Sequence, residues 1–352
     1  MKKLALILPN NIWVSPYVNI YTRLLDTLGV DYELISWNRE GREEPGIQYQ
    51  KCEKSHNIIK VLWAYICFAK FVKKVILSNQ FERIIVFSPQ VALFLASFLE
   101  RHYKGRYIFD YRDLSLEQKP FLAKRFKKVL SNSYANIISS PGFKQYLPKG
   151  FNYIISHNFN AEIVKKAIKD PPSPYEGKDM SVLTIGAIRT DMNPEVIDAL
   201  GNAPGFHLSF VGKGISAEYL EKYAKHKGYN NIEFSGYYNK NEESDIIRRH
   251  AFINIVYPLI PSHISALSNR FYNSLIYKRP MIVTRNTAQG QYASKYDVGI
   301  VIDNCDHLAE RIIDYKKKLD FKKYVKQCNQ LLDTFLDENK QFESKISEFV
   351  KA

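Results

Sequence analysis

Short apolar runs alternate with longer stretches of helical spacing along most of the chain. The first series of apolar runs, each of which predicts a buried strand, occupies residues 4–8, 32–36, 83–88, 107–110 and 136–139. The stretches of helical length between them occupy residues 16–29, 58–78, 90–102 and 119–131. A second series of predicted strands, again with helices between them, occupies residues 181–185, 208–211, 232–234, 252–256, 281–284 and 300–302. Such alternation is typical of parallel sheets covered by helices on both faces, so we expect an α/β protein.

A proline-rich segment separates the two series. Residues 170–174 read Asp-Pro-Pro-Ser-Pro, and we interpret residues 161–178 as a linker from their composition. At 352 residues the chain is long for one domain and suits two. We therefore expect a first domain over residues 1–165, a second over residues 175–335, and a charged C-terminal helix over residues 336–352.

Basic residues are concentrated in the first half. The whole chain carries a formal charge of +14, and residues 1–160 contain 23 Lys and Arg against 12 Asp and Glu. This asymmetry predicts a polyanionic partner, either nucleic acid or an anionic membrane surface. Since the chain contains no nucleic-acid-binding motif, we expect no nucleic-acid partner.

Two helical stretches account for much of the basic excess. Residues 58–77 are nearly all apolar but include four lysines, and residues 119–128 alternate basic with apolar side chains. This combination is typical of helices that lie on an anionic membrane surface. The alternative is a pair of core helices whose basic rims are solvated.

Signals for export, membrane spanning and metal binding are weak. The N-terminal Met-Lys-Lys and apolar residues 4–8 imitate a signal peptide, but the run ends at Pro9 and predicts a strand instead. No apolar run approaches the roughly 20 residues of a membrane span. The four cysteines lack paired or metal-ligand spacing, so we expect a cytoplasmic protein without disulfides or a metal site.

Residues 268–301 carry the clearest family resemblance. They predict a short helix, a buried strand over residues 281–284, and a polar, glycine-containing loop over residues 284–291 at the carboxyl end of that strand, where open α/β sheets bind ligands. The segment resembles glycosyltransferases with two facing Rossmann-like domains, the GT-B fold, and in particular family 4, the group 1 transferases. The matching residues are Asn269, Arg270, Phe271, Asn273, Lys278, Pro280, Met281 and Ile282.

The resemblance implies a fold, a donor and a set of contacts. It implies that a C-terminal helix crosses back onto the first domain, that the donor is a nucleotide diphosphate sugar, and that neither metal nor cofactor is needed. It places Arg270 near the ribose of the donor.

Two glutamates of that family are replaced in this chain. The family spaces them eight positions apart, one near the donor sugar and one at the ribose hydroxyls, and the same spacing here falls on Ser265 and Asn273. An amide oxygen can accept a hydrogen bond from ribose, but a charge-assisted bond is about twice as strong as a neutral one. The replacement could alter the donor, weaken its binding, or mark an inactive relative.

Other donor-binding candidates lie at three more strand ends. Gly186 and Arg189 follow the first strand of the second series, where the resemblance implies that the arginine neutralises the leaving diphosphate. Gly212 and Lys213 follow the next strand, and Tyr237 follows the third and could stack on a base. Ordinary tight turns and a surface arginine are the alternative interpretation.

Candidate catalytic residues cluster after the fourth strand of the first series. Residues 107–114 include Asp110, Arg112 and Asp113 and resemble the Ile-Arg-Asp-Leu-Trp motif of group 1 transferases that build bacterial surface polysaccharides. Either aspartate could orient or deprotonate an acceptor hydroxyl, and Arg112 could hold a phosphate. The alternative is an ion pair between Arg112 and a neighbouring aspartate.

Together these features predict a glycosyltransferase. It would move a sugar from a nucleotide diphosphate sugar to a glycan acceptor, lipid-linked in this interpretation, in bacterial capsule, O-antigen or exopolysaccharide synthesis, with retention of configuration implied by the family. It would act from the inner face of the cytoplasmic membrane. A nucleotide-sugar 2-epimerase of the same fold and a non-catalytic polysaccharide-assembly scaffold are the alternatives.

Overall fold

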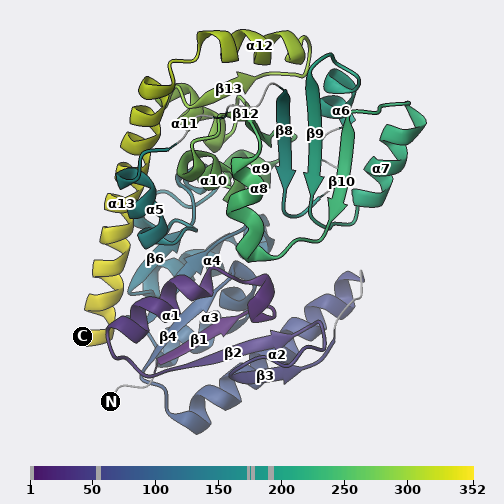
Figure 1. Cartoon of the computed structure of the whole chain (residues 1–352). Helices are drawn as coiled ribbons and strands as arrows, with labels where there is room; N and C mark the ends of the chain where they lie inside the picture. Colours follow the sequence, from purple (N-terminus) through teal and green to yellow (C-terminus); the bar gives the residue numbers. More distant parts are fainter. Residues whose placement is uncertain (1–3, 53–56, 173–174, 176–178, 189–193) are drawn as a thin grey trace. The chain divides into compact units, whose positions relative to one another are not determined.

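The chain folds into two compact α/β units (Figure 1). The computed structural model describes residues 4–52, 57–172, 175, 179–188 and 194–352. The first unit comprises Met1–Asn158 together with Asp337–Ala352, and the second comprises Phe159–Leu336. Each unit has its own parallel sheet and its own apolar cores.

The first unit contains a seven-stranded parallel sheet in the order β3-β2-β1-β4-β5-β6-β7. Its strands are β1 (Leu4–Leu8), β2 (Tyr32–Asn38), β3 (Ile47–Gln50), β4 (Arg83–Phe87), β5 (Tyr107–Tyr111), β6 (Ala135–Ile138) and β7 (Tyr153–Ile155). The sequence pattern missed the edge strands β3 and β7. No side chain of either strand is fully buried, so neither needs the continuous apolar run that identifies central strands.

Helices cover both faces of this sheet. One face packs against α2 (Ile58–Asn79), α3 (Pro89–His102) and α4 (Ala123–Asn132), and the other against α1 (Val18–Thr27) and the last turns of α13 (Phe321–Lys351). Short 3₁₀ turns complete the unit: η1 (Ile12–Val14), η2 (Leu116–Gln118), η3 (Pro120–Leu122) and η4 (Pro141–Gln145).

A buried histidine ties the end of α13 to the first unit. His157 is fully buried, and its Nε2 lies 2.6 Å from Oε2 of Glu338 on α13. Because a carboxylate only accepts hydrogen bonds, the imidazole donates. Burial lowers the pKa of His157, and the nearby Glu338 only partly offsets this effect. The lowered pKa favours the neutral imidazole.

The second unit contains a six-stranded parallel sheet in the order β10-β9-β8-β11-β12-β13. Its strands are β8 (Met180–Ile185), β9 (Phe206–Val211), β10 (Ile232–Gly236), β11 (Phe252–Ile255), β12 (Met281–Thr284) and β13 (Gly299–Ile302). One face packs against α6 (Pro194–Leu200), α7 (Ala217–His226) and α12 (Leu308–Lys318). The other packs against α5 (Ala161–Lys169), α8 (Glu243–Arg248), α10 (Asn269–Tyr277), α11 (Ala288–Tyr296) and the first turns of α13. Two short elements, η5 (Lys240–Glu242) and α9 (Pro261–Ser265), lie in the connections.

The two parallel sheets confirm the predicted fold class, and three local expectations need correction. Residues 161–169 are not linker but the helix α5, whose Val164 is buried in the second unit. The C-terminal helix expected over residues 336–352 begins earlier, because α13 starts at Phe321. The expected loop over residues 284–291 is shorter, because α11 begins at Ala288.

None of the helices in the described part of the chain combines the length and the apolar content needed to cross a membrane.

The C-cap of α10 is a buried lysine. Lys278 has a left-handed φ of 55° and is 1% exposed, and its Nζ donates to the carbonyl of Leu275 at 2.8 Å. Burial lowers its pKa from 10.5 to about 8, against weaker opposing effects of Cys328 and Asp333. The unfolded chain therefore holds this proton more tightly than the folded one, so stability should rise as the pH increases from 8 to 10.5.

We predict that Lys278→Met stabilises the protein at pH 7. Removing a buried charge should add about 2 kcal/mol to the free energy of unfolding, after loss of one hydrogen bond. The gain should shrink towards pH 10.5, where the wild-type lysine is neutral in the folded state. Urea unfolding at pH 7 and pH 10 measures the gain in stability and its decrease with pH. The control is Lys225→Met, which replaces an exposed lysine on α7. A variant less stable than wild type at pH 7 contradicts the interpretation.

Candidate functional site

The carboxyl ends of the six parallel strands of the second unit meet at one edge of the sheet. The central strand β8 lies between β9 and β11. The helix that follows β8, α6, packs on one face, whereas the helix α10 that follows β11 packs on the other. The winding therefore reverses between β8 and β11, and open α/β sheets bind ligands at the carboxyl end of such a switch point.

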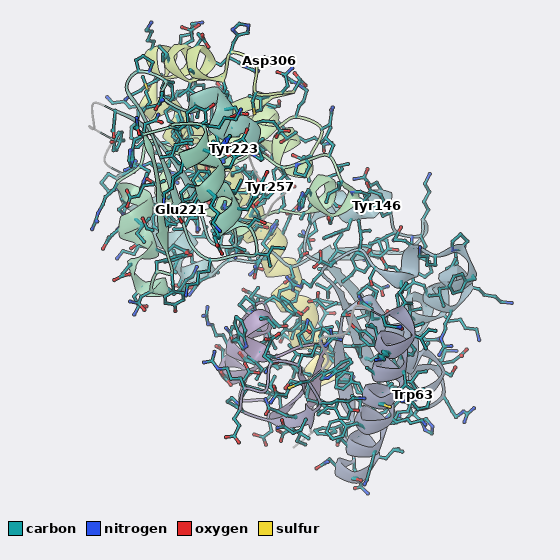
Figure 2. All side chains as sticks on the ribbon, turned by 90° about the vertical axis from the view of Figure 1, so that its right-hand side faces the viewer. Trp63, Tyr146, Glu221, Tyr223, Tyr257 and Asp306 are labelled. Atoms are coloured by element: carbon teal, nitrogen blue, oxygen red, sulfur yellow. The ribbon has the colours of Figure 1, made fainter. Side chains whose placement is uncertain are left out.

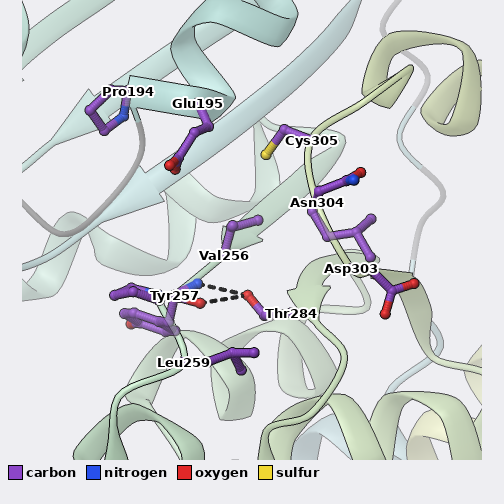
Figure 3. Close-up of a pocket in the computed structure, with 11 residues that line it drawn as sticks. Pro194, Glu195, Val256, Tyr257, Leu259, Thr284, Asp303, Asn304 and Cys305 are labelled. Carbon is purple, nitrogen blue, oxygen red and sulfur yellow. Dashed lines mark hydrogen bonds between the residues drawn. The ribbon is translucent and has the colours of Figure 1, made fainter.

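A cavity of about 450 Å³ opens at this switch point (Figure 3). It is lined by the start of α6, by the chain after β11, and by the ends of β12 and β13, with the residues Pro194, Glu195, Val256, Tyr257, Pro258, Leu259, Thr284, Ile302, Asp303, Asn304 and Cys305. The hydroxyl of Thr284 accepts from the N–H of Tyr257 at 2.9 Å and donates to its carbonyl at 2.8 Å. This double contact fixes the chain after β11 against the end of β12.

Arg270 fixes the neighbouring end of β8. Its side chain reaches from α10, is 5% exposed, and donates to the carbonyls of Ile185 at 2.5 Å and Ala187 at 3.0 Å. The guanidinium thus shapes the loop after β8. A direct contact with a donor remains a prediction.

The two predicted glycines allow the loops after β8 and β9 to touch. Gly186 has a φ of +97°, which side chains rarely adopt. A Cβ on Gly212 would lie 1.9 Å from the carbonyl oxygen of Gly186, so only glycine fits there. Both glycines therefore have backbone roles, and their binding of a donor remains a prediction.

The structure brings Lys213 and Tyr237 together at the ends of β9 and β10. Both side chains are exposed, Tyr237 by 71%, and the ammonium of Lys213 lies 5.9 Å from the centroid of the tyrosine ring. A cation and an aromatic face are therefore available side by side at the same sheet edge as the cavity.

The positions of the two replaced glutamates have different surroundings. Ser265 ends α9, is fully buried, and its hydroxyl donates to the carbonyl of Pro261. Asn273 lies on α10, is half-buried, and donates from Nδ2 to Oε1 of Glu243 at 3.2 Å. No motif in the sequence pointed to Glu243. Arg189, the expected diphosphate anchor, lies outside the described residues.

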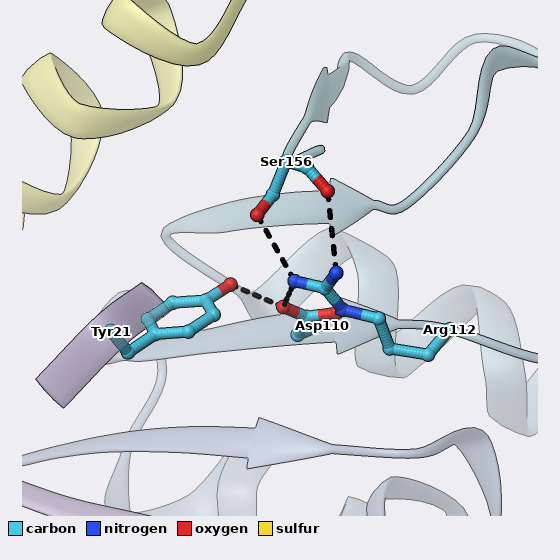
Figure 4. Close-up of polar contacts among 4 residues, drawn as sticks. All are labelled: Tyr21, Asp110, Arg112 and Ser156. Atoms are coloured by element: carbon cyan, nitrogen blue, oxygen red, sulfur yellow. Dashed lines mark hydrogen bonds and ion pairs between the residues drawn. The ribbon is translucent and has the colours of Figure 1, made fainter. Parts of the chain in front are cut away.

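In the first unit, Asp110 and Arg112 form the ion pair that was the alternative interpretation (Figure 4). Asp110 has no exposed surface, and its carboxylate accepts from Nε and Nη2 of Arg112 at 2.6 and 2.7 Å. Tyr21, on α1, also donates to Asp110, and Arg112 donates to the hydroxyl of Ser156 at 3.0 Å and to its carbonyl at 3.3 Å.

The charges of this cluster reinforce each other. Burial, the largest single effect, lowers the pKa of Arg112, but Asp110, Tyr21 and Tyr17 together raise it by more, so the net pKa is raised and the arginine stays charged. Burial and the same carboxylate raise the pKa of Tyr21, which keeps the phenol protonated as a donor. Asp113, three residues after Asp110, is exposed.

Most of the residues that line the cavity were missed by sequence reasoning. They come from the start of α6 and from three strand ends, and they carry no motif of fixed spacing. Val256 and Ile302 lay within predicted strands, and Thr284 began the polar loop expected at a ligand site. Among the residues that the structure describes, no three His, Cys, Asp or Glu side chains are arranged to hold a metal ion. The expectation of metal-free chemistry stays a prediction.

We predict that Arg112→Ala is strongly destabilising. The substitution leaves Asp110 buried without its cation, and breaking a buried pair in this way costs about 3–5 kcal/mol. The double variant Asp110→Asn/Arg112→Met should lose less of the free energy of unfolding, because it leaves no buried charge. Chemical unfolding measures both, with Arg125→Ala on the exposed side of α4 as the control. Equal losses in the single and double variants would contradict the buried-pair interpretation.

Comparison with known proteins relates the chain to solved structures. No protein-family model matches the sequence, and no curated protein is significantly similar to it. A sucrose-phosphate synthase from Thermosynechococcus elongatus superposes with a TM-score of 0.72 at 12% identity over 100% of both chains. Anabaena Alr3699/HepE in complex with UDP and glucose superposes with a TM-score of 0.68 at 10% identity, over 99% of this chain and 100% of that chain. The lipopolysaccharide outer core galactosyltransferase WaaB gives 0.66 at 14% identity over the same shares.

Identities this low bear on the fold alone, and the match extends over the full length of the chain. Together with the two parallel sheets, it confirms the expectation drawn from residues 268–301: the chain has the GT-B fold.

Proposed function

We propose that the protein is a glycosyltransferase that moves a sugar from a nucleotide diphosphate sugar to a hydroxyl of a glycan acceptor. The observation that carries this proposal is the cavity at the switch point of the second unit, which shares its sheet edge with Lys213 and Tyr237. The solved structure of HepE, which has a similar fold, contains UDP and glucose. A nucleotide sugar has the size and the mixed chemistry that such a site can bind.

The donor groups match the side chains at this edge. Lys213 would stabilise the diphosphate as it leaves, which is where negative charge develops in the reaction. Tyr237 would stack on the base, an interaction that tolerates any nucleobase. Glu195 and Asn304, which both line the cavity, would accept hydrogen bonds from sugar hydroxyls. The resemblance to family 4 implies a second diphosphate contact at Arg189, and we expect neither metal nor cofactor.

The acceptor would be activated in the first unit. Asp110 is enclosed by Arg112 and Tyr21, so in this proposal it positions the end of β5, and the exposed Asp113 accepts the proton of the acceptor hydroxyl. Retention of configuration, as in family 4, completes the proposed reaction.

A membrane surface is the proposed location of the acceptor. The side chains of five residues on α2 are exposed: Ile59, Trp63, Lys70, Lys74 and Leu77. Neighbouring members of this set are three, four or seven residues apart, which places all of them on one side of the helix. Figure 2 labels Trp63 on this helix. The side chain of Trp63 is 58% exposed, and the Lys70 ammonium lies 5.8 Å from the centroid of its ring. A core helix normally has a polar outer side, so exposed apolar side chains beside lysines favour an interfacial location.

Charge supports an anionic surface. The helix α2 contains no acidic residue, and α4, on the same face of the sheet, exposes Lys124, Arg125 and Lys127. Each basic residue near an anionic bilayer contributes about 1 kcal/mol to binding. We therefore propose a peripheral protein of the inner face of the cytoplasmic membrane that extends a lipid-linked glycan in capsule, O-antigen or exopolysaccharide synthesis.

Three assays separate the proposed transferase from the other two interpretations. Release of nucleoside diphosphate that depends on a lipid-linked acceptor supports transfer. Release without acceptor, together with a new free sugar, supports a nucleotide-sugar 2-epimerase. Nucleotide binding without any turnover supports a scaffold.

We predict that UDP, GDP or CDP raises the melting temperature, because a ligand that binds only the folded state stabilises it. Lys213→Ala should weaken the binding of that nucleotide about tenfold, since hydrogen bonds to charged groups contribute about 1.5–3 kcal/mol. Calorimetric titration measures the affinity, and Lys222→Ala on the exposed surface of α7 is the matched control. If none of the three nucleotides shifts the melting temperature, the proposed function is wrong.

We also predict selective binding to anionic vesicles. The protein should sediment with vesicles containing phosphatidylglycerol but not with pure phosphatidylcholine, and added salt should release it. The variant Ile59→Ser/Trp63→Ser should bind about tenfold more weakly, because it removes apolar area that enters the interface. Tyr219→Ser, which replaces an aromatic 52% exposed in the second unit, is the control. Equal sedimentation with both kinds of vesicle would exclude a charge-dependent surface.

A further inference from the structure

The carboxylate of Glu243 lies at the same sheet edge as Tyr237 and has an unusual environment. Glu243 begins α8, six residues after Tyr237, and is 8% exposed. Its Oε1 accepts from Nζ of Lys240 at 2.5 Å and from Nδ2 of Asn273 at 3.2 Å, and its Oε2 accepts from the hydroxyl of Tyr238 at 2.7 Å. Burial, followed by this contact, raises the pKa of Tyr238, which keeps the phenol a donor.

The three donors hold the carboxylate in place but do not use all of its acceptor positions. A carboxylate offers about four lone-pair positions, and the three contacts leave one on Oε2. Asn273 gives its Nδ2 to Glu243, and within the described part of the chain its Oδ1 accepts no hydrogen bond. The pair therefore presents two neighbouring acceptors, one on the carboxyl group of Glu243 and one on the amide of Asn273.

Two neighbouring acceptors suit a vicinal diol. The 2′ and 3′ hydroxyls of ribose are two adjacent donors, and a carboxylate accepts from a hydroxyl more strongly than a neutral group does. Lys213 and Tyr237 lie at the same edge, so a cation, an aromatic ring and a diol acceptor occur together there. These are the groups needed by the diphosphate, the base and the ribose of one nucleotide.

We propose that Glu243 supplies the carboxylate that binds the ribose hydroxyls of the donor, with the Asn273 amide as the second acceptor. The proposal rests on the proposed function, because it requires a nucleotide at this edge. It also accounts for the absence of an acidic residue at position 273, since a second helix brings a carboxylate to the same place.

The test compares two ligands with two proteins by calorimetric titration. The ligands are whichever of UDP, GDP and CDP gives the largest thermal shift, and its 2′,3′-dideoxy analogue. Wild type should bind the dideoxy analogue about tenfold more weakly than the parent nucleotide. The variant Glu243→Gln should bind the parent nucleotide about tenfold more weakly than wild type does. Its affinity for the dideoxy analogue should hardly change, because the analogue has no ribose hydroxyls for Glu243 to bind.

Two further variants separate binding from packing. Glu243→Gln/Asn273→Glu moves the carboxylate from α8 to α10 and should recover most of the affinity for the parent nucleotide. Glu221→Gln, which removes an exposed carboxylate on α7, should change neither ligand. A merely structural role for Glu243 predicts equal losses for both ligands and a lowered melting temperature.

The outcomes distinguish failure of this inference from failure of the proposed function. If wild type binds the parent and the dideoxy nucleotide equally well, the assignment of Glu243 is wrong even though a nucleotide site exists. That comparison needs no variant, so it decides the matter even if Glu243→Gln does not fold. If none of the three nucleotides binds, the proposed function itself fails.

Discussion

The buried guanidinium of Arg270 holds the carbonyls of Ile185 and Ala187, and the candidate site depends on that contact. A buried cation requires partners, and here the partners are the backbone at the end of β8, where the winding of the sheet reverses. The same loop contacts Gly212 on its other side. The carbonyl of Gly186 occupies the space that a side chain at position 212 would need, so the loop keeps this position only if residue 212 is glycine. The loop that borders the switch point is thus set by an arginine on α10 and a glycine after β9.

Parallel strand order explains why so many polar groups gather there. Every strand of the sheet ends at the same edge, so Lys213, Tyr237 and the cavity share it although they are distant in sequence. The first unit follows the same rule at the end of β5. There the polar groups mostly satisfy one another: Asp110 and Arg112 neutralise each other in the interior, and Asp113 remains at the surface. A site and a structural ion pair can therefore arise from the same strand-end position.

The helix α2 has two apolar sides with different roles. Its inner side, with Phe68, Val72 and Ile76 among others, packs into the core of the first unit. Its outer side keeps Ile59 and Trp63 in solvent beside lysines, where a helix of the core would carry polar side chains. The nearly continuous apolar sequence of this helix is thus the sum of two surfaces, and burial separates them where composition does not.

The sequence by itself determined the class of fold and the central strands, because strands buried on both faces must be continuously apolar. It could not identify the edge strands β3 and β7, which are only half-buried, or the helix α5, which directly precedes a proline-rich segment. It also named candidate residues by their place at strand ends, and the structure placed Lys213 beside Tyr237. Only the tertiary structure decided that Arg270 turns inward, that Asp110 is enclosed, and that Glu243 meets Asn273. The physical reason is that a sequence pattern records how deeply each segment is buried, whereas the partner of a polar side chain comes from another segment that packing brings within reach.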